Sequence, residues 1–255
     1  MEPLQILYRD ENYVAVHKPA GLLVHRSWLA GREEGQRFAL QMTRDQLGRW
    51  VYPVHRLDRP TSGVLIFGFS SEAARRLVRE FERRRIEKRY LAVVRGYAEA
   101  RGEIDYPLLA EDGVAPQRAV TDYRRLATVE LEVAVGRYAT ARYSLLEVFP
   151  RTGRMRQIRK HMKHIFHPIV GDTSHGDGRH NRIFRGRFDC RRLLLQAQPP
   201  GVPAPLRGRG GAHRCGCGSG AGASVRAARL VVLAGGYRAL TRSSTAWACP
   251  LGLTL

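Results

Sequence analysis

The segment Val51 to Ser70 places two apolar runs on either side of a cluster of turn-forming residues. The run after the cluster, Val64 to Phe69, and the run before it predict two strands joined by a tight connection. The only carboxylate of the segment, Asp58, would then lie in the connection, between Arg56 and Arg59. A carboxylate beside two cations can act as a nucleophile or accept a proton. The alternative is that Asp58 and its neighbours only form the turn.

The chain carries a large excess of basic residues, which narrows the classes of partner. Lysine and arginine number 43 against 23 acids among 255 residues, a formal net charge of +20. This balance points to a polyanion, either a nucleic acid or an anionic membrane. No apolar stretch of the sequence reaches the ~18 residues of a membrane-spanning helix, and the charged start lacks the apolar region of a signal peptide. We therefore expect a cytoplasmic protein with no membrane association.

Hydrophobic periodicity predicts both strands and helices in the first 198 residues. A hairpin is expected from Ile6 to Lys18, and a helix is expected to begin at Ser70 or Ser71, where a serine can cap it. Alternation predicts a strand at Lys88 to Arg95 with Tyr90 on one of its sides. The other expected elements are a helix at 38–47, a strand at 139–149 and a helical stripe at 155–165.

Neither a disulfide nor a metal site is expected in this part of the chain. Cys190 is the only cysteine before residue 199, so no pair is available there. Four histidines, at positions 161, 164, 167 and 175, lie near one another in sequence. Zinc sites usually add cysteine or carboxylate ligands, and no clear one accompanies these histidines.

The segment HRLDRPTSG, residues 55–63, resembles the catalytic signature of the RluA family of RNA pseudouridine synthases. Other segments resemble further motifs of that family, in the family's order: VHKPAGLLVHRS from Val16, KRYLAVVRG from Lys88, TGRMRQIRKHM from Thr152 and HPIVGDTSHGD from His167. The resemblance covers about residues 4 to 198. It implies an α+β fold with a mixed, mainly antiparallel central sheet and flanking helices, and a catalytic domain at residues 1–198.

The same resemblance implies roles for individual residues. Asp58, the aspartate of HRLD, is implied to be the catalytic residue, and Arg159, the arginine of the Gln-Ile-Arg step, is implied to pair with it. Tyr90 is implied to pack against the target base. Arg156 stands where the family usually has histidine, which leaves contacts through charge but not the usual hydrogen bonding. The residues expected to bind RNA are Arg56, which is implied to take the place of a flipped uridine, with Arg59, Lys18, Arg154 and Arg156.

The activity that the resemblance implies is isomerisation of a uridine in RNA to pseudouridine, which involves no redox change and needs no cofactor. The motifs LLVHRSW, HRLDRPTSG and GDTSHGD are most similar to those of family members that modify uridine 65 of tRNA. We therefore expect a monomeric enzyme that acts on tRNA. Two alternatives stay open at this point: a ribosomal RNA pseudouridine synthase, and a basic RNA-binding protein that has kept the scaffold without catalysis.

Residues 199–255 differ sharply in composition from the rest of the chain. They contain no Asp, Glu or Lys, but seven arginines, eleven glycines and three of the four cysteines. We interpret this segment as an out-of-frame reading of a GC-rich gene or as a disordered extension, with the first favoured. Without the closing strand of the family, the sheet edge beside Leu193 to Leu195 is expected to lack its partner.

Overall fold

The computed structural model describes residues 2–25, 37–110, 113 and 115–199, together with the backbone of two short segments near the C-terminus. These two segments are β12 (Ala248–Cys249) and β13 (Leu253–Thr254), which pair antiparallel with each other. Apart from them and Pro199, the interpretation of residues 199–255 as a tail concerns residues outside the described part of the chain.

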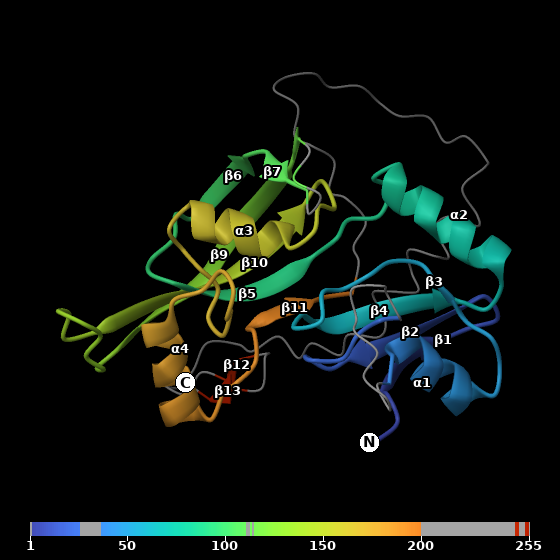
Figure 1. Ribbon diagram of the computed structural model, residues 1–255, viewed down its shortest axis with the longest axis horizontal. Coiled ribbons are helices and arrows are strands. Elements are labelled where there is room, and N and C mark those ends of the chain that lie inside the picture. The colour runs from blue at the N-terminus through green and yellow to red at the C-terminus, as the bar shows by residue number, and fades with distance from the viewer. Residues whose placement is uncertain are drawn as a thin grey trace, which may run out of the picture.

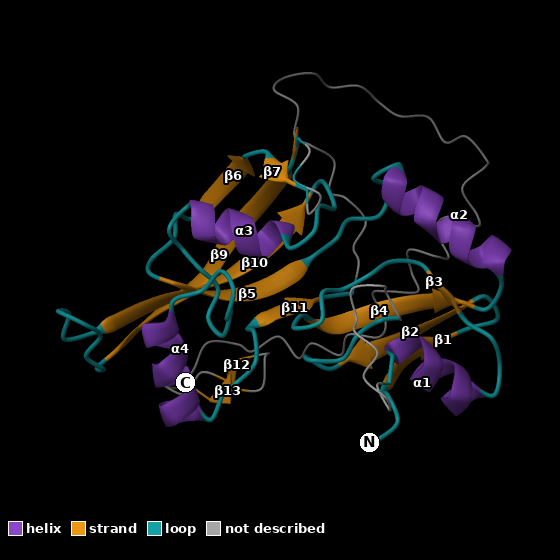
Figure 2. Cartoon of the chain, in the orientation of Figure 1, coloured by secondary structure: helices purple, strands orange, loops and turns teal. Residues whose placement is uncertain are grey.

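Nine strands form one central sheet in the order β1-β2-β4-β11-β5-β10-β9-β6, with β3 paired to β4 (Figures 1 and 2). All neighbours are antiparallel except β11 and β4, which are parallel. The expected mixed, mainly antiparallel sheet is thereby confirmed. The strands are β1 (Ile6–Arg9), β2 (Tyr13–Lys18), β3 (Tyr52–Pro53), β4 (Ser62–Gly68), β5 (Tyr90–Arg95), β6 (Arg101–Asp105), β9 (Val120–Leu131), β10 (Ala141–Pro150) and β11 (Leu195–Ala197), with a separate hairpin of β7 (Leu108–Leu109) and β8 (Pro116–Gln117).

In the described part of the chain, four helices flank the sheet: α1 (Ala39–Leu47), α2 (Ser71–Glu82), α3 (Gln157–His164) and α4 (Gly178–Phe188). Figure 1 shows α1 and α2 beside the half of the sheet with β1, β2 and β4, and α3 and α4 beside the half with β5, β9 and β10. The expected cap of α2 is present, because the hydroxyl of Ser70 accepts a hydrogen bond from the Ala73 amide. Among the described helices, none is long and apolar enough to cross a membrane.

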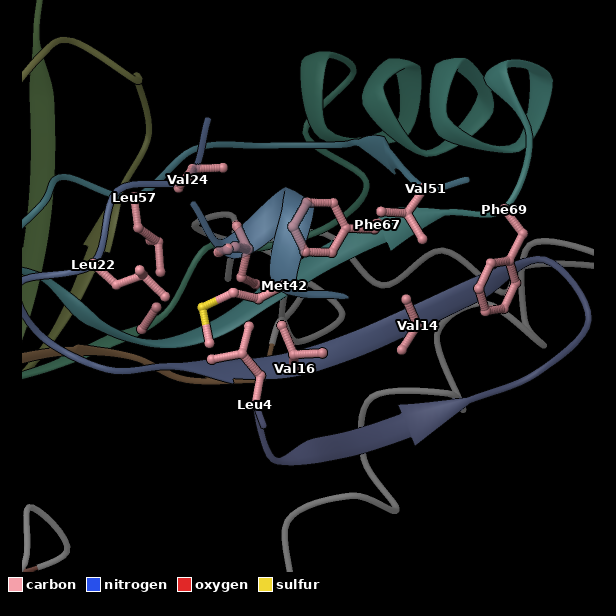
Figure 3. Close-up of a cluster of buried hydrophobic side chains, with 13 residues drawn as sticks. Leu4, Val14, Val16, Leu22, Val24, Met42, Val51, Leu57, Phe67 and Phe69 are labelled. Carbon is pink, nitrogen blue, oxygen red and sulfur yellow. The ribbon is translucent and has the colours of Figure 1, made fainter. Parts of the chain in front are cut away.

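Alternation along the strands explains why helices cover both faces. In β2, Val14 and Val16 pack against α1 (Figure 3), whereas Tyr13 and Ala15 on the other face pack against α2. In β5, Ala92 and Val94 belong to the cluster that includes residues of α3, and Val93 belongs to the cluster that includes Phe184 of α4. Each half of the sheet is therefore a three-layer sandwich with one helix on each face.

The helices α1 and α3 lie on the same face of the sheet. Leu195 and Ala197, two positions apart in β11, belong to the clusters beneath α3 and α1 respectively, and Tyr90 packs against both clusters. Side chains two positions apart in a strand point to the same face. The groove between α1 and α3 therefore runs over the middle of the sheet, where β4, β11 and β5 lie.

The expectation of an unpartnered sheet edge beside Leu193 to Leu195 is wrong. The strand β11 lies between β4 and β5 and pairs with both of them. The contact with β4 is close: Gly63 has φ +115°, and a Cβ added there would lie 2.1 Å from the carbonyl oxygen of Ala197. Only glycine fits this position without strain. The chain thus places its late strand in the centre of the sheet.

Candidate active site

A cleft of about 810 Å³ opens in the groove between the two halves of the sheet. Its walls are loops that meet at this point from distant parts of the sequence. They are the loop after β2 (residues 20–25), the connection before β4 (56–60), the loop before α3 with the start of that helix (153–159), the loop before α4 (171–174) and the segment before β11 (191–193).

The connection that carries Asp58 is a tight turn fixed to the loop after β2. The amide of Thr61 donates to the carbonyl of Asp58 at 3.0 Å, which closes the turn. The carbonyl of Arg59 accepts from the amide of Gly21 at 2.8 Å and from the ammonium of Lys18 at 3.2 Å. The side chain of Asp58 is 28% exposed and lines the cleft. Both readings of the sequence thus apply, because Asp58 forms a turn and also presents its carboxylate to the cleft.

Lys18 lies beneath the cleft rather than on its surface, which corrects the expectation that it contacts RNA. Its residue exposure is 0%, and its ammonium donates to the carbonyls of Pro19, Leu22 and Arg59. Burial lowers the pKa of Lys18 to about 8, against the opposing effect of Asp58. The side chain therefore holds two loops together below the carboxylate.

His55, the first residue of HRLD, also has a structural position. Its Nε2 accepts a hydrogen bond from the amide of Ile66 at 3.2 Å, which requires a neutral ring. Burial, with a smaller contribution from Lys88, lowers the pKa of His55 to about 4. The imidazole therefore stays neutral at physiological pH and fixes the start of the connection to β4.

Arg159 projects from α3 and contacts two carboxylates. Its Nη1 lies 3.6 Å from Oδ2 of Asp58, as the expected pairing requires. Its Nε and Nη2 donate to Asp172 at 2.7 and 2.8 Å, a bidentate pair in which both side chains are 5% exposed or less. Because Asp172 fixes the Nε–Nη2 edge of the guanidinium, the remaining nitrogen, Nη1, faces Asp58.

Asp172 was not singled out from the sequence, although it lies in the segment HPIVGDTSHGD. Its Oδ1 also accepts from the amides of Ser174 and His175, both at 2.9 Å. Burial alone would raise the pKa of Asp172, but the hydrogen bonds from Arg159 and from these amides hold it below its usual value. The preceding Gly171 has φ +80°, and a Cβ there would lie 1.9 Å from the carbonyl oxygen of Arg192.

Gln157 fixes the loop that forms another wall of the cleft. Its side-chain oxygen accepts from the Thr152 hydroxyl at 2.6 Å and from the Arg154 amide at 3.0 Å. Its amide nitrogen donates to the carbonyl of Val120 and the hydroxyl of Thr121. The preceding residue, Arg156, is the N-cap of α3 and has φ 55°. The Gln-Ile-Arg step therefore has two roles, since glutamine shapes the loop and arginine reaches the carboxylates.

Tyr90 lies at the start of β5, between the core clusters of the two halves. Burial, and to a smaller extent the Asp58 carboxylate, raise the pKa of Tyr90 to about 12. The phenol is therefore neutral over the physiological range. Tyr90 is not among the described residues that line the cleft, so its packing against a base stays a prediction.

Arginines dominate the lining of the cleft. Arg56, Arg59, Arg154 and Arg156, which were expected to bind RNA, all line it, as does Arg159. Arg191 and Arg192 extend this basic lining and were not singled out from the sequence. Among the described lining residues, Asp58 is the only carboxylate. The cleft thus presents one acid within a surface suited to a polyanion.

Three of the four histidines that lie near one another in sequence have separate side-chain partners, whereas the Nε2 of His175 is buried without a hydrogen-bond partner among the described residues. The ring of His161 is buried between the Thr121 hydroxyl and the Tyr106 carbonyl, and that of His167 contacts the Arg95 carbonyl. His164 stacks on Tyr106 at 3.7 Å. Within the described ranges, no group of three or more His, Cys, Asp or Glu side chains could hold a metal ion.

The model of the RNA pseudouridylate synthase family matches residues 12–164, which include Asp58, Tyr90 and Arg159. The chain belongs to this family. It is 54% identical over 215 residues to tRNA pseudouridine synthase C of Pectobacterium carotovorum, covering 80% of this chain and 57% of that protein. It is 53% identical over 205 residues to tRNA pseudouridine synthase C of Pasteurella multocida, covering 76% of this chain and 84% of that protein.

Solved structures of the same family have the same fold. Human RNA Pseudouridylate Synthase Domain Containing 1 superposes with a TM-score of 0.60 at 27% identity, covering 80% of this chain and 82% of that one. The family's enzymes are isomerases. The position of the cleft over β4, β11 and β5 places the carboxylate in the centre of the family fold.

Proposed function

We propose that this enzyme converts a uridine of tRNA to pseudouridine, and that the uridine is number 65. Support comes from the two relatives that carry the name tRNA pseudouridine synthase C and are more than half identical to this chain. The observation that carries the proposal is the cleft itself, with one carboxylate among seven arginines. A reaction on RNA needs a catalytic group at the target nucleotide and a basic surface that binds the phosphates. The carboxylate of Asp58 and the cleft arginines supply these two features.

In the reaction, the bond between N1 of uracil and C1′ of ribose breaks, and a bond from C5 to C1′ forms. The proton of C5 is lost to solvent, and N1 gains a proton. Asp58 either attacks C1′ or removes a proton from the sugar to give a glycal. In both cases its carboxylate has to reach the ribose of the target, and its 28% exposure on the cleft wall allows that contact.

Arg159, on the wall of the cleft, and Tyr90, near Asp58, support this chemistry. Arg159 directs one nitrogen at Asp58 and keeps the other two bound to Asp172, so the carboxylate is oriented without a tight bidentate pair that would block it. Tyr90 supplies the apolar floor against which the detached base can turn. The step involves no redox change, so these residues need no cofactor for it.

The cleft arginines bind the phosphates of the RNA backbone, and one of them fills the space left by the flipped nucleotide. Arg56 is exposed and lies two positions before Asp58, as expected for a planar cation that replaces the uridine in its stack. Arg59 and Arg154 have one edge bound to backbone carbonyls, those of Gly21 and Arg118, which fixes their direction. The expectations of a monomer and of a cytoplasmic location stay predictions.

Replacement of the catalytic carboxylate tests the proposal. Asp58→Asn should abolish tritium release from tRNA labelled at C5 of uridine, while tRNA binding changes little, because the variant removes one acid from a basic surface. Asp45→Asn, which removes an exposed acid paired with Arg44 on α1, is the matched control and should keep full activity. Residual turnover above a few per cent in Asp58→Asn would remove Asp58 from its role.

The position in tRNA requires a separate measurement. Pseudouridines are mapped in tRNA and ribosomal RNA from cells with and without the gene. Loss at uridine 65 of tRNA supports the proposal. Loss confined to ribosomal RNA contradicts the tRNA assignment and leaves the catalytic role of Asp58 intact.

A further inference from the structure

Phe166 has a backbone conformation that its side chain disfavours. The helix α3 ends in a Schellman motif, in which the amide of Phe166 donates to Lys163 at 3.0 Å and that of His167 donates to Met162 at 2.9 Å. Phe166 occupies the left-handed position of this motif with φ 63°. Glycine, or less often asparagine, is the usual residue there.

Burial of the Phe166 ring does not offset the free-energy cost of its backbone conformation. The residue is 79% exposed, more than any other large hydrophobic residue in the described part of the chain. Left-handed backbone is unfavourable at a residue with a Cβ. A strained position that holds an exposed aromatic ring points to a role outside the fold.

A second hollow adjoins Phe166. Its volume is about 950 Å³, and it lies between the turn of the β9–β10 hairpin and the start of α4. Arg95 connects the two features, since its Nη1 donates to Asp177 at 2.7 Å and its Nη2 to the carbonyl of Phe166 at 3.3 Å. A residue that lines the hollow therefore holds the backbone of Phe166 in place.

The hollow is lined by cations and by aromatic rings, and none of its described lining residues is acidic. Its four arginines are Arg95, Arg137, Arg142 and Arg179. Asp177 and Glu130 pair with some of them from outside the lining, yet the side chains of Arg142 and Arg179 stay 57% and 61% exposed. Tyr138 on the hairpin turn is 60% exposed.

We propose that Phe166 and this hollow form a second RNA-binding site, distinct from the catalytic cleft. An unpaired base stacks on the ring of Phe166, and the neighbouring phosphates lie on the four arginines. The proposal rests on the proposed function, because it assigns the site to the same RNA that enters the cleft. The loop before α4 joins the two sites: Ser174 lines the cleft, and Arg179, five residues later, lines the hollow.

Removing the ring separates this role from a structural one. Phe166→Gly should weaken tRNA binding by roughly fivefold or more, the effect of losing one base stack. It should raise KM for tRNA and leave the single-turnover rate at saturating tRNA unchanged. The same change should keep or raise the temperature of thermal unfolding, because glycine relieves the left-handed strain. Phe166→Tyr keeps the ring and should bind like the wild type.

The arginines are tested by the salt dependence of binding. The double variant Arg137→Gln, Arg179→Gln should reduce the slope of log affinity against log salt by about one to two, since each lost phosphate contact removes about 0.9. The matched control is Arg75→Gln with Arg101→Gln, which removes two exposed arginines from α2 and from the edge strand β6. The control should change the slope less than the double variant does.

Two outcomes would overturn the second site. One is tRNA affinity of Phe166→Gly equal to that of the wild type, and the other is equal slopes for the double variant and its control. The failure of the proposed function looks different, because the wild type would then form no pseudouridine in tRNA. Binding of the same tRNA by Asp58→Asn carrying Phe166→Gly still reports on the second site in that case.

Discussion

The bidentate pair of Arg159 with Asp172 makes a quantitative prediction for Asp172→Asn. In the variant, the amide oxygen can keep the hydrogen bonds from Ser174 and His175, which leaves the amide NH₂ group facing the Nε–H of Arg159. Two donors then oppose each other, and a guanidinium that is 4% exposed loses its main anion. Removing one partner of a buried ion pair lowers the free energy of unfolding by about 3–5 kcal/mol.

The loss of stability should be measurable by heat and by urea. About 3 kcal/mol corresponds to a fall of roughly 6–12 °C in Tm for a domain of this size. Asp45→Asn breaks an exposed pair of the same type and should change the free energy of unfolding by less than about 0.5 kcal/mol. The comparison isolates burial, since both variants replace an aspartate that contacts an arginine.

The difference between wild type and variant should depend on pH. The folded protein holds the pKa of Asp172 below its usual value, so the carboxylate stabilises the fold fully above about pH 4, the value expected in the unfolded chain. This stabilisation is lost as pH falls through the native pKa. The gap in unfolding free energy should therefore be constant near neutrality and shrink under acid conditions.

Activity should fall as well, because Arg159 is no longer held by Asp172. Its guanidinium can turn and close the 3.6 Å separation from Asp58 into a tight pair, which should lower kcat by on the order of tenfold while tRNA affinity stays within a factor of two or three. A variant as stable and as active as the wild type would refute this account of the two carboxylates.

Two further predictions concern the centre of the sheet and the cleft. Gly63→Ala should destabilise the protein by several kcal/mol in urea unfolding, because the new methyl group would lie 2.1 Å from the Ala197 carbonyl; Gly186→Ala on α4, where a Cβ meets nothing within 4 Å, is the control and should be neutral or stabilising. The affinity of Asp58→Asn for tRNA should fall by roughly 150-fold between 50 and 200 mM salt if about four cleft arginines contact phosphates. A flat salt dependence would contradict an RNA-binding cleft.

Local signals in the sequence predicted the elements whose formation depends on near neighbours. The hairpin of β1 and β2, the Ser70 cap of α2 and the alternating strand that carries Tyr90 all form where expected. The resemblance of short motifs implied that Arg159 pairs with Asp58, and their side chains do approach each other. For the hairpin, the cap and the strand, residues within about ten positions along the chain determine the local structure.

Features that depend on distant contacts were not predicted. The helix α4 buries only Asn181 and Phe184, so its sequence has little apolar periodicity to reveal it. Lys18 is fully buried because three carbonyls from two loops surround its ammonium, an arrangement rare for lysine. Asp172 reaches Arg159 only because Asn181 of α4 fixes its loop, donating to the Asp172 carbonyl and accepting from the Gly171 amide.

The central position of β11 has a consequence for the order of folding. The strands β4 and β5 have no ladder with each other and are joined in the sheet through residues 195–197, about 130 positions after β4. Pairing over such a distance is slow, because the intervening chain has to be ordered first. During synthesis each half can collapse around its own helices, but the two walls of the cleft come into register only when β11 has left the ribosome. A nascent chain that stops before Leu195 would therefore hold Asp58 and Arg159 on two unlinked halves.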